Sequence, residues 1–175
     1  MHPAHNIADT TGPENSGLER LEALLAQVTD PEIPVVSIRD LGILRNISLD
    51  GGQVTVTITT TYSGCPAMST IKADIRQTLS QAGYENVQVK QILSPAWTTD
   101  WMTAQGREKL REYGIAPPQK SNQGHCAMIS PGTAVVCPQC GSERTECISE
   151  FGSTACKALY RCLDCAEPFD YFKCI

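Results

Sequence analysis

The sequence has 175 residues, of which 41% are hydrophobic, and a formal net charge of −5. That length allows one domain or two small ones with a hydrophobic core, and the acidic balance argues against broad attraction to nucleic acid or anionic membranes. No apolar run reaches the ~18 residues of a membrane-spanning helix, and the first residues do not resemble a secretory signal. We therefore expect a soluble cytoplasmic protein whose nine cysteines serve metal or thiol chemistry rather than disulfides.

The beginning of the chain is predicted to be a disordered tail over residues 1–16, followed by an amphipathic helix. Ser16 can cap that helix, and apolar residues then recur at helical spacing: Leu18, Leu21, Leu24, Leu25 and Val28. Residues 29–34 break the helix, because their two prolines remove hydrogen-bond donors and bias the preceding residues away from helix. Asp30, directly before Pro31, is typical of a capped turn.

Three strands are predicted next. Residues 43–49 and 53–60 alternate apolar and polar side chains, and Asp50-Gly51-Gly52 between them is typical of a hairpin turn. Residues 87–92 alternate in the same way. Because a helical crossover joins parallel neighbours, we expect this third strand to pair alongside the hairpin.

Cys65 stands where the second strand gives way to a helix. Pro66 suits the first helical position, Gly83 suits the stop, and apolar residues between them have helical spacing: Met68, Ile71, Ile75 and Leu79. A thiol there faces unpaired backbone N–H groups and the positive end of the helix dipole, which should lower its pKa and favour thiolate. No acidic residue follows until Asp74. Cys65 is therefore a candidate functional thiol, the alternative being a small buried core residue.

A further helix is predicted after the third strand. Thr98 or Thr99 can cap it, Gly114 and the prolines after it can end it, and it contains Trp101, Met102, Leu110 and Tyr113. Trp97 and Trp101 have helical spacing and are interpreted as core residues. Residues 116–132 are rich in Pro, Gly, Ser and polar residues, which is typical of a linker.

The N-terminal motifs resemble a known family. The Thr-rich strand followed by Gly64-Cys65-Pro66, together with the stretches 30–34 (DPEIP) and 40–43 (DLGI), is similar to the SufT-like iron–sulfur-assembly factors. The resemblance implies that Cys65 is the functional cysteine and that Asp30 lies near it. It also implies that the two residues handle iron, sulfide or a partner thiol.

Two Cys-x-x-Cys pairs near the end of the chain predict a metal site. Cys137 and Cys140 are separated by 21 residues from Cys162 and Cys165, close to the spacing of zinc sites. Gly141 suits the sharp turn that such a knuckle needs, whereas Ala166 takes the equivalent position in the second pair. Structural zinc is the preferred interpretation, although four thiolates can also hold iron or an iron–sulfur cluster.

The C-terminal sequence resembles a more specific family. Residues 151–162 (FGSTACKALYRC) and 167–174 (EPFDYFKC) are similar to the phenylacetate-degradation protein D family, accessory subunits of the phenylacetyl-CoA epoxidase system. The resemblance covers nearly everything after Leu18. It implies a maturation factor, not an enzyme, that helps to assemble an iron–sulfur or di-iron centre in a reductase or oxygenase subunit. Cys156 and Cys174 are kept as additional candidate ligands.

Three alternatives remain open from the residues. The first is an electron-transfer subunit with a cluster on the C-terminal cysteines, and the second is a thiol oxidoreductase that uses one Cys-x-x-Cys pair. The third, a nucleic-acid-binding ribbon, is disfavoured because residues 133–175 contain more acidic than basic side chains. The oligomeric state, including a homodimer, stays open.

We therefore expect an α+β protein in two parts. A small α/β domain over residues 17–115, built as helix, hairpin, helix, strand and helix, precedes the linker over 116–132. A four-cysteine zinc ribbon over residues 133–175 completes the chain.

Overall fold

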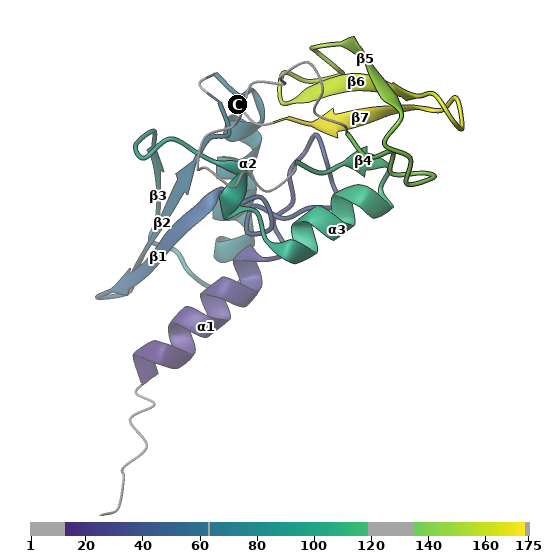
Figure 1. Cartoon of the computed structure of the whole chain (residues 1–175). Coiled ribbons are helices and arrows are strands. Elements are labelled where there is room, and N and C mark those ends of the chain that lie inside the picture. Colours follow the sequence, from purple (N-terminus) through teal and green to yellow (C-terminus); the bar gives the residue numbers. More distant parts are fainter. Residues whose placement is uncertain (1–12, 63, 119–134, 174–175) are drawn as a thin grey trace, which may run out of the picture.

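A computed structural model describes residues 13–62, 64–118 and 135–173 (Figure 1). It contains a three-stranded sheet of order β1-β2-β3 and a four-stranded sheet of order β4-β7-β6-β5, together with helices that cover the first sheet. The expected α+β class is confirmed. Within these ranges no helix has the length and apolar character needed to cross a membrane.

The first helix, α1, spans Pro13–Leu25, so it begins three residues before Ser16. Ser16 lies inside the helix, and the prediction that it caps the helix is wrong. Proline is favoured at a first helical position because its missing N–H would have no partner there. Leu21 and Leu25, which were predicted for the apolar face, are fully buried.

The first sheet has the three predicted strands, and the third pairs alongside the hairpin as expected. Strand β1 (Leu44–Asp50) runs antiparallel to β2 (Gln53–Thr59), and β3 (Val87–Ile92) lies parallel to β2 on its other side. Helix α2 (Ala67–Gln81) makes the crossover between β2 and β3. The inward side chains of β2 and α2 share one core and have no exposed surface: Val54, Val56, Ile58, Ile71, Ile75 and Leu79.

The end of α2 is as predicted. Gly83 has a φ of +92°, in the left-handed region that favours glycine. Beyond it, the N–H of Tyr84 donates to the carbonyl of Leu79 at 3.0 Å, which turns the chain back over the last helical turn.

The helix expected after Trp97 is divided into two pieces. A 3-10 turn, η1 (Thr99–Trp101), is capped by Thr98 as predicted, and α3 (Ala104–Glu112) begins separately with Thr103 as its cap. The division has a tertiary cause, because Asp40 accepts hydrogen bonds from the N–H and the hydroxyl of Thr103, at 2.9 and 3.2 Å. Sequence spacing alone gave no sign of that contact.

The second sheet is the expected ribbon, with one additional strand. Strands β5 (Thr145–Ser149), β6 (Lys157–Cys162) and β7 (Pro168–Phe172) form an antiparallel meander. Strand β4 (Ile115–Ala116) pairs in parallel with β7 and lies at the junction of the expected first domain and linker. Residues 119–132 of the expected linker and residues 133 and 134 of the expected ribbon lie outside the described residues. The domain boundaries stay a prediction.

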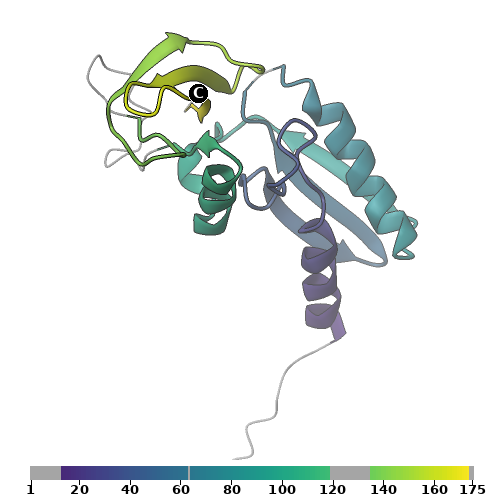
Figure 2. The same cartoon turned by 90° about the vertical axis from the view of Figure 1, so that its right-hand side faces the viewer.

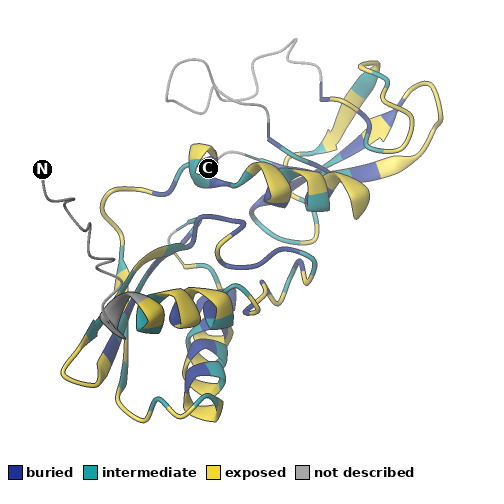
Figure 3. Cartoon of the chain, turned by 90° about the horizontal axis from the view of Figure 1, so that it is seen from below, coloured by how far each residue is buried: buried dark blue, intermediate teal, exposed yellow. Residues whose placement is uncertain are grey.

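The ribbon lies against one end of the first sheet, at the end where α2 begins (Figure 2). Trp97 joins the two regions, because its indole N–H donates to the carbonyl of Leu41 at 2.9 Å and its ring meets Phe172 of β7 edge-on at 6.1 Å. Both residues of β4 are buried, as are Phe169 and Phe172 of β7, and Figure 3 shows that the outer faces of the helices are exposed. Trp97 is therefore a core residue as predicted, whereas Trp101 is only half-buried beneath the Arg45 guanidinium.

Candidate functional site

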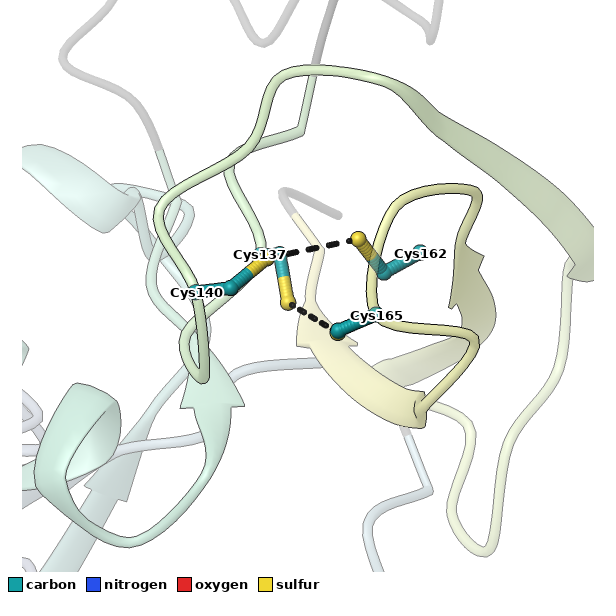
Figure 4. A group of neighbouring side chains, drawn as sticks. All are labelled: Cys137, Cys140, Cys162 and Cys165. Carbon is teal, nitrogen blue, oxygen red and sulfur yellow. Dashed lines mark hydrogen bonds between the residues drawn. The ribbon is translucent and has the colours of Figure 1, made fainter.

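Four cysteine sulfurs gather at the end of the ribbon as the sequence predicted (Figure 4). The Sγ atoms of Cys137, Cys140, Cys162 and Cys165 all lie within 4.8 Å of one another. The Cys137–Cys165 and Cys140–Cys162 separations are 3.8 and 3.5 Å. Zn–S bonds of about 2.3 Å in a tetrahedron place sulfurs about 3.8 Å apart, so the four side chains fit a closed tetrahedral metal site.

Two similar turns bring the sulfurs together. In the first, Gly141 has a φ of +76° and its N–H donates to the carbonyl of Cys137 at 2.9 Å. In the second, Ala166 has a φ of +63°, which is the conformation that glycine would adopt more readily. The turn after Cys162 and Cys165 therefore forms without a glycine, because Ala166 adopts the strained left-handed conformation.

Backbone N–H groups favour the thiolate form of Cys162. The N–H groups of Cys165 and Asp164 point at the sulfur of Cys162, the second at 3.4 Å, and they lower the pKa of Cys162 to about 6. A metal binds the thiolate form, so this hydrogen bonding favours the ligating state. Arg144 then pairs with Asp164 across the two turns and ties them together.

Cys65 lies in the short connection between β2 and α2, beside the ribbon. Its side chain is partly exposed, and the N-cap position of α2 belongs to Pro66, so Cys65 precedes the cap by one residue. The carbonyl of Cys65 accepts from the N–H of Met68 at 3.4 Å, which holds the residue against the first turn. The N–H of Ala67, the first residue of α2, interacts with the thiol, as the sequence indicated.

The pKa of Cys65 changes in the direction opposite to that predicted. Burial raises the pKa of the thiol, the N–H of Ala67 and the hydroxyl of Tyr62 lower it, and the charges of Glu32 and Asp30 raise it further. The helix terminus acts as expected but is outweighed. The prediction failed because the fold buries the thiol, and because the turn 30–33 adds the charges of two acidic groups that are distant in sequence.

Asp30 is the cap of a turn, and the structure places it near Cys65. Its Oδ1 atom accepts hydrogen bonds from the N–H groups of Glu32 and Ile33, at 2.8 and 3.0 Å. Burial raises the pKa of Asp30 despite these bonds. The turn predicted from Asp30-Pro31 is confirmed, and a role for Asp30 in handling iron or sulfide stays a prediction.

Sequence reasoning missed several neighbours of Cys65. Glu32 and Tyr62 both interact with it, and burial followed by the charge of Cys65 raises the pKa of Tyr62 to about 12. Glu32 lies two residues after Asp30, and Tyr62 lies three residues before Cys65. Closeness in sequence to the two predicted site residues was therefore the signal that could have found them. The buried Lys157 also acts on Asp30 and Glu32, and no local pattern pointed to it.

The other cysteines have different environments. Cys156 is buried in the core of the first region, 3.0 Å from the Thr154 hydroxyl, whereas Cys147 is exposed on β5. None of the seven cysteines in the described ranges forms a disulfide. Cys126 and the candidate ligand Cys174 lie outside the described residues.

The Asp40-Leu41-Gly42 motif has a structural role in the first region. Asp40 accepts from Lys109 at 2.6 Å and from the N–H of Ser37 at 3.1 Å. Gly42 has a φ of +68°, and a Cβ atom on it would lie 2.6 Å from Trp101. The motif thus joins the loop before β1 to the segment around α3, which explains its sequence in structural terms.

Comparisons with known proteins match both regions. The model of the iron–sulfur cluster assembly protein family matches residues 18–90, and the model of the PaaD zinc beta ribbon domain matches residues 122–173. The crystal structure of a domain of unknown function, DUF59, from Bacillus anthracis superposes with a TM-score of 0.52 at 27% identity, over 55% of this chain and 93% of that one. The fold and the sulfur sites define an iron–sulfur-assembly type of domain joined to a cysteine ribbon.

Two relatives make the classification more specific. An Fe-S protein maturation auxiliary factor of Porphyromonas gingivalis is 36% identical, over 55% of this chain and 90% of that protein. A protein of Escherichia coli, whose name provisionally assigns it as the D subunit of 1,2-phenylacetyl-CoA epoxidase, is 55% identical over 87% of this chain and 90% of its own length. The chain belongs to this family of 1,2-phenylacetyl-CoA epoxidase D subunits.

Proposed function

We propose that this protein is an accessory maturation factor that helps to assemble an iron–sulfur or di-iron centre in a subunit of phenylacetyl-CoA epoxidase. The observation that carries the proposal is the partly exposed Cys65 at the mouth of α2, in a domain similar to Fe-S protein maturation auxiliary factors. The client is a protein, either the reductase or an oxygenase subunit. In this proposal the chain itself does not oxidise phenylacetyl-CoA.

The surroundings of Cys65 suit a thiol that binds iron or sulfide only transiently. Burial and the charges of Glu32 and Asp30 keep the thiol protonated when nothing is bound, because they disfavour a further negative charge. The same carboxylates attract an iron cation, whose charge would offset their effect on the sulfur. A single thiol binds iron less firmly than four, so the cargo can be passed to a client.

The ribbon has a structural part in this proposal. Zinc held by Cys137, Cys140, Cys162 and Cys165 would supply folding free energy to a region with few large apolar residues. The ribbon would then keep β7, and with it Phe172, in place against Trp97. A permanent ion in the ribbon and a transient one at Cys65 have separate roles.

Client loading tests the proposal. The protein is co-expressed with the epoxidase reductase or oxygenase subunits, and the iron and acid-labile sulfide in each purified client are measured. Cys65→Ser should abolish the gain in cluster or iron content while the fold is retained. Cys147→Ser, which changes an exposed thiol on β5, is the matched control and should leave loading unchanged. Normal loading by the Cys65→Ser variant would refute the proposal.

An electron-transfer subunit is the second candidate, and the sulfur geometry of the ribbon is what favours it. Sulfurs 3.5 and 3.8 Å apart suit a single iron as well as zinc. Element analysis and EPR of protein purified without oxygen separate the two functions. One zinc per chain and no EPR signal supports the maturation factor, and bound redox-active iron supports the carrier.

A further inference from the structure

We propose that the end of the molecule around Cys65 carries a docking surface for the iron-binding segment of the client, formed by Leu93, Phe151 and Lys173. Leu93 and Phe151 are its apolar anchors, and Lys173 is its charged contact. The inference rests on the proposed function and deepens it, because it names the surface that the client contacts while iron or sulfide passes from Cys65.

The exposure of the two apolar anchors is the first support. Leu93 and Phe151 are the most exposed large apolar side chains of the described ranges, at 64% and 65%. Single exposed apolar residues are common on protein surfaces and need no explanation. These two differ because separate loops, one from each region, bring them to the end of the molecule at which Cys65 lies.

The register of the first sheet places Leu93. Strand β3 runs parallel to β2, and their last residues, Ile92 and Thr59, are paired. The Thr59 hydroxyl donates to the carbonyl of Ile92 at 3.2 Å, which fixes the two strand ends side by side. Leu93 follows β3 directly, and soon after β2 the N–H of Cys65 donates to the carbonyl of Tyr62 at 3.3 Å. Leu93 and Cys65 therefore follow neighbouring strands at the same end of the sheet.

Phe151 belongs to the loop between β5 and β6. Figures 1 and 2 both show this loop beside the start of α2. The N–H of Gly152 donates to the carbonyl of Lys157 at 2.7 Å, and the Ser149 hydroxyl donates to the carbonyl of Phe151 at 2.8 Å. A Cβ atom on Gly152 would lie 2.9 Å from the Asp170 carboxylate, so the loop packs closely against β7. Phe151 thus projects from a fixed turn, which lowers the entropy cost of binding a partner.

Lys173 adds a positive charge beside Phe151. Its ammonium lies 4.1 Å from the centroid of the Phe151 ring and donates to the carbonyl of Glu150. Its backbone N–H donates to the carbonyl of Cys156 at 3.0 Å, which holds the residue against the base of the loop. None of the ion pairs between described residues engages this ammonium. Its charge can therefore pair with an anionic group of a partner.

The docking surface defines the chemistry of its partner. The iron-binding segment of a client carries cysteine thiolates for an iron–sulfur cluster or carboxylates for a di-iron centre. Either kind of ligand is anionic and complements Lys173, while apolar side chains beside the ligands would contact Leu93 and Phe151. A second copy of this chain fits less well, because two chains of net charge −5 repel each other.

Binding of an iron-free client tests the anchors. The full-length protein, with metal in its ribbon, is titrated calorimetrically with the purified, iron-free reductase or oxygenase subunits. Leu93→Ala and Phe151→Ala should each weaken binding about tenfold or more, as truncation of an interface anchor does. Phe151→Leu should lose less, because it keeps an apolar side chain. Tyr113→Ala, which changes an exposed aromatic residue just after α3, is the matched control and should bind as wild type does.

The anchors fail this test if either alanine variant binds the client as tightly as wild type does. Absence of binding between the wild-type protein and every subunit would also overturn the inference. The affinity of Phe151→Leu then shows whether apolar contact, rather than the shape of the loop, is what the client requires.

A charge reversal tests the third residue. Lys173→Glu should weaken binding at low salt, and its difference from wild type should shrink as ionic strength rises, because salt screens exposed charges. Lys173→Arg keeps the charge and is the control. Equal affinities of Lys173→Glu and wild type at low salt would exclude Lys173 from the docking surface.

Client loading separates this inference from the proposed function. If Phe151→Ala binds and loads clients normally while Cys65→Ser does not load them, the docking surface is refuted and the proposed function stands. If Cys65→Ser loads clients normally while Phe151→Ala fails to bind them, the surface stands and the proposed function fails. Light scattering of the protein alone tests the other occupant, since a wild-type dimer that Phe151→Ala converts to a monomer would assign the surface to a second copy and overturn the inference.

Discussion

The ribbon and the first region both present cysteine, but they surround it in opposite ways. In the ribbon, four sulfurs lie within 4.8 Å of one another, and backbone N–H groups lower the pKa of Cys162. At the first region, Cys65 is flanked by carboxylates and burial raises its pKa. A helix terminus therefore does not by itself make a thiolate, because nearby charges and solvation decide the outcome.

The two regions also differ in what stabilises them. The first region has a continuous apolar core formed by α1, α2 and the first sheet, whereas the ribbon core has only a few large side chains. We therefore expect the ribbon to depend on a metal held by its four cysteines, whereas the first region depends on packing and on buried polar contacts such as those of Asp40. Substitutions in the two regions should accordingly have different consequences.

Cys140→Ser should have the largest effect, because it removes one of four ligands from a closed site. Structural zinc contributes about 10–16 kcal/mol of binding free energy in small zinc domains, so most of the ribbon's stability should be lost. Metal content should fall below one per chain, and hydrogen exchange should accelerate in β5, β6 and β7 but not in α1. Unchanged metal content together with an unchanged melting curve would contradict this expectation.

Asp40→Asn should destabilise the first region by about 2–4 kcal/mol, because it leaves Lys109 without its buried carboxylate. Burial acts to raise the pKa of Asp40, but hydrogen bonds from Lys109 and Ser37 outweigh it and hold the pKa below its ordinary value.

The sign of the pH dependence follows from that lowered pKa. The carboxylate stabilises the fold above the unfolded-state pKa, and this contribution is lost as the pH falls through the folded-state pKa. Urea unfolding at neutral and acidic pH measures both effects. The exposed Glu112→Gln is the control and should change stability by less than about 0.5 kcal/mol. Equal losses in the two variants would exclude a special role for Asp40.

Ala166→Gly should stabilise the ribbon by about 1 kcal/mol, because it relieves a left-handed alanine. The same change at the exposed Ala73 in α2 should destabilise by about 1 kcal/mol, since glycine is unfavourable within a helix. Thermal unfolding of the two variants, each loaded with metal, gives the comparison. A loss of stability in Ala166→Gly would mean that the turn is not strained.

Glu32→Gln should leave the fold intact and affect only the Cys65 thiol. Removal of a negative charge favours the thiolate, so the pKa of Cys65 should fall. The alkylation rate of Cys65, followed by mass spectrometry against pH, should rise at lower pH than in wild type. Glu112→Gln provides the distant control, and coincident profiles for all three proteins would show that Glu32 has no influence.

The local patterns predicted much of this molecule. Alternation in residues 53–60 and 87–92 identified β2 and β3, and the crossover rule placed the third strand alongside the hairpin, where it pairs with β2. The spacing of Cys137 and Cys140 relative to Cys162 and Cys165 predicted that these four sulfurs come together, because each pair needs only a local turn. These predictions depend on short stretches of chain, although the predicted Ser16 cap, which is also local, was wrong.

Contacts between distant segments could not be predicted in the same way. Burial of Cys65 by the folded chain reversed the expected pKa change, and Glu32 adds to it across 33 positions of sequence. Thr103 ends the helical run because Asp40 binds it, 63 positions away. Cys156 reaches the first core from the beginning of β6. In each case a tertiary contact overrides a local preference that was correctly recognised.

The parallel pairing of β4 with β7 affects how this protein can be divided. Ile115 and Ala116 cover the outer edge of β7 at Asp170 and Tyr171, although they precede the cysteine ribbon by about twenty positions. A fragment that began at residue 133 would lack that cover and would expose a strand edge open to association with other chains. The first region therefore contributes a strand to the sheet of the ribbon. Gain or loss of the segment 133–175 alone would leave a strand edge without its partner.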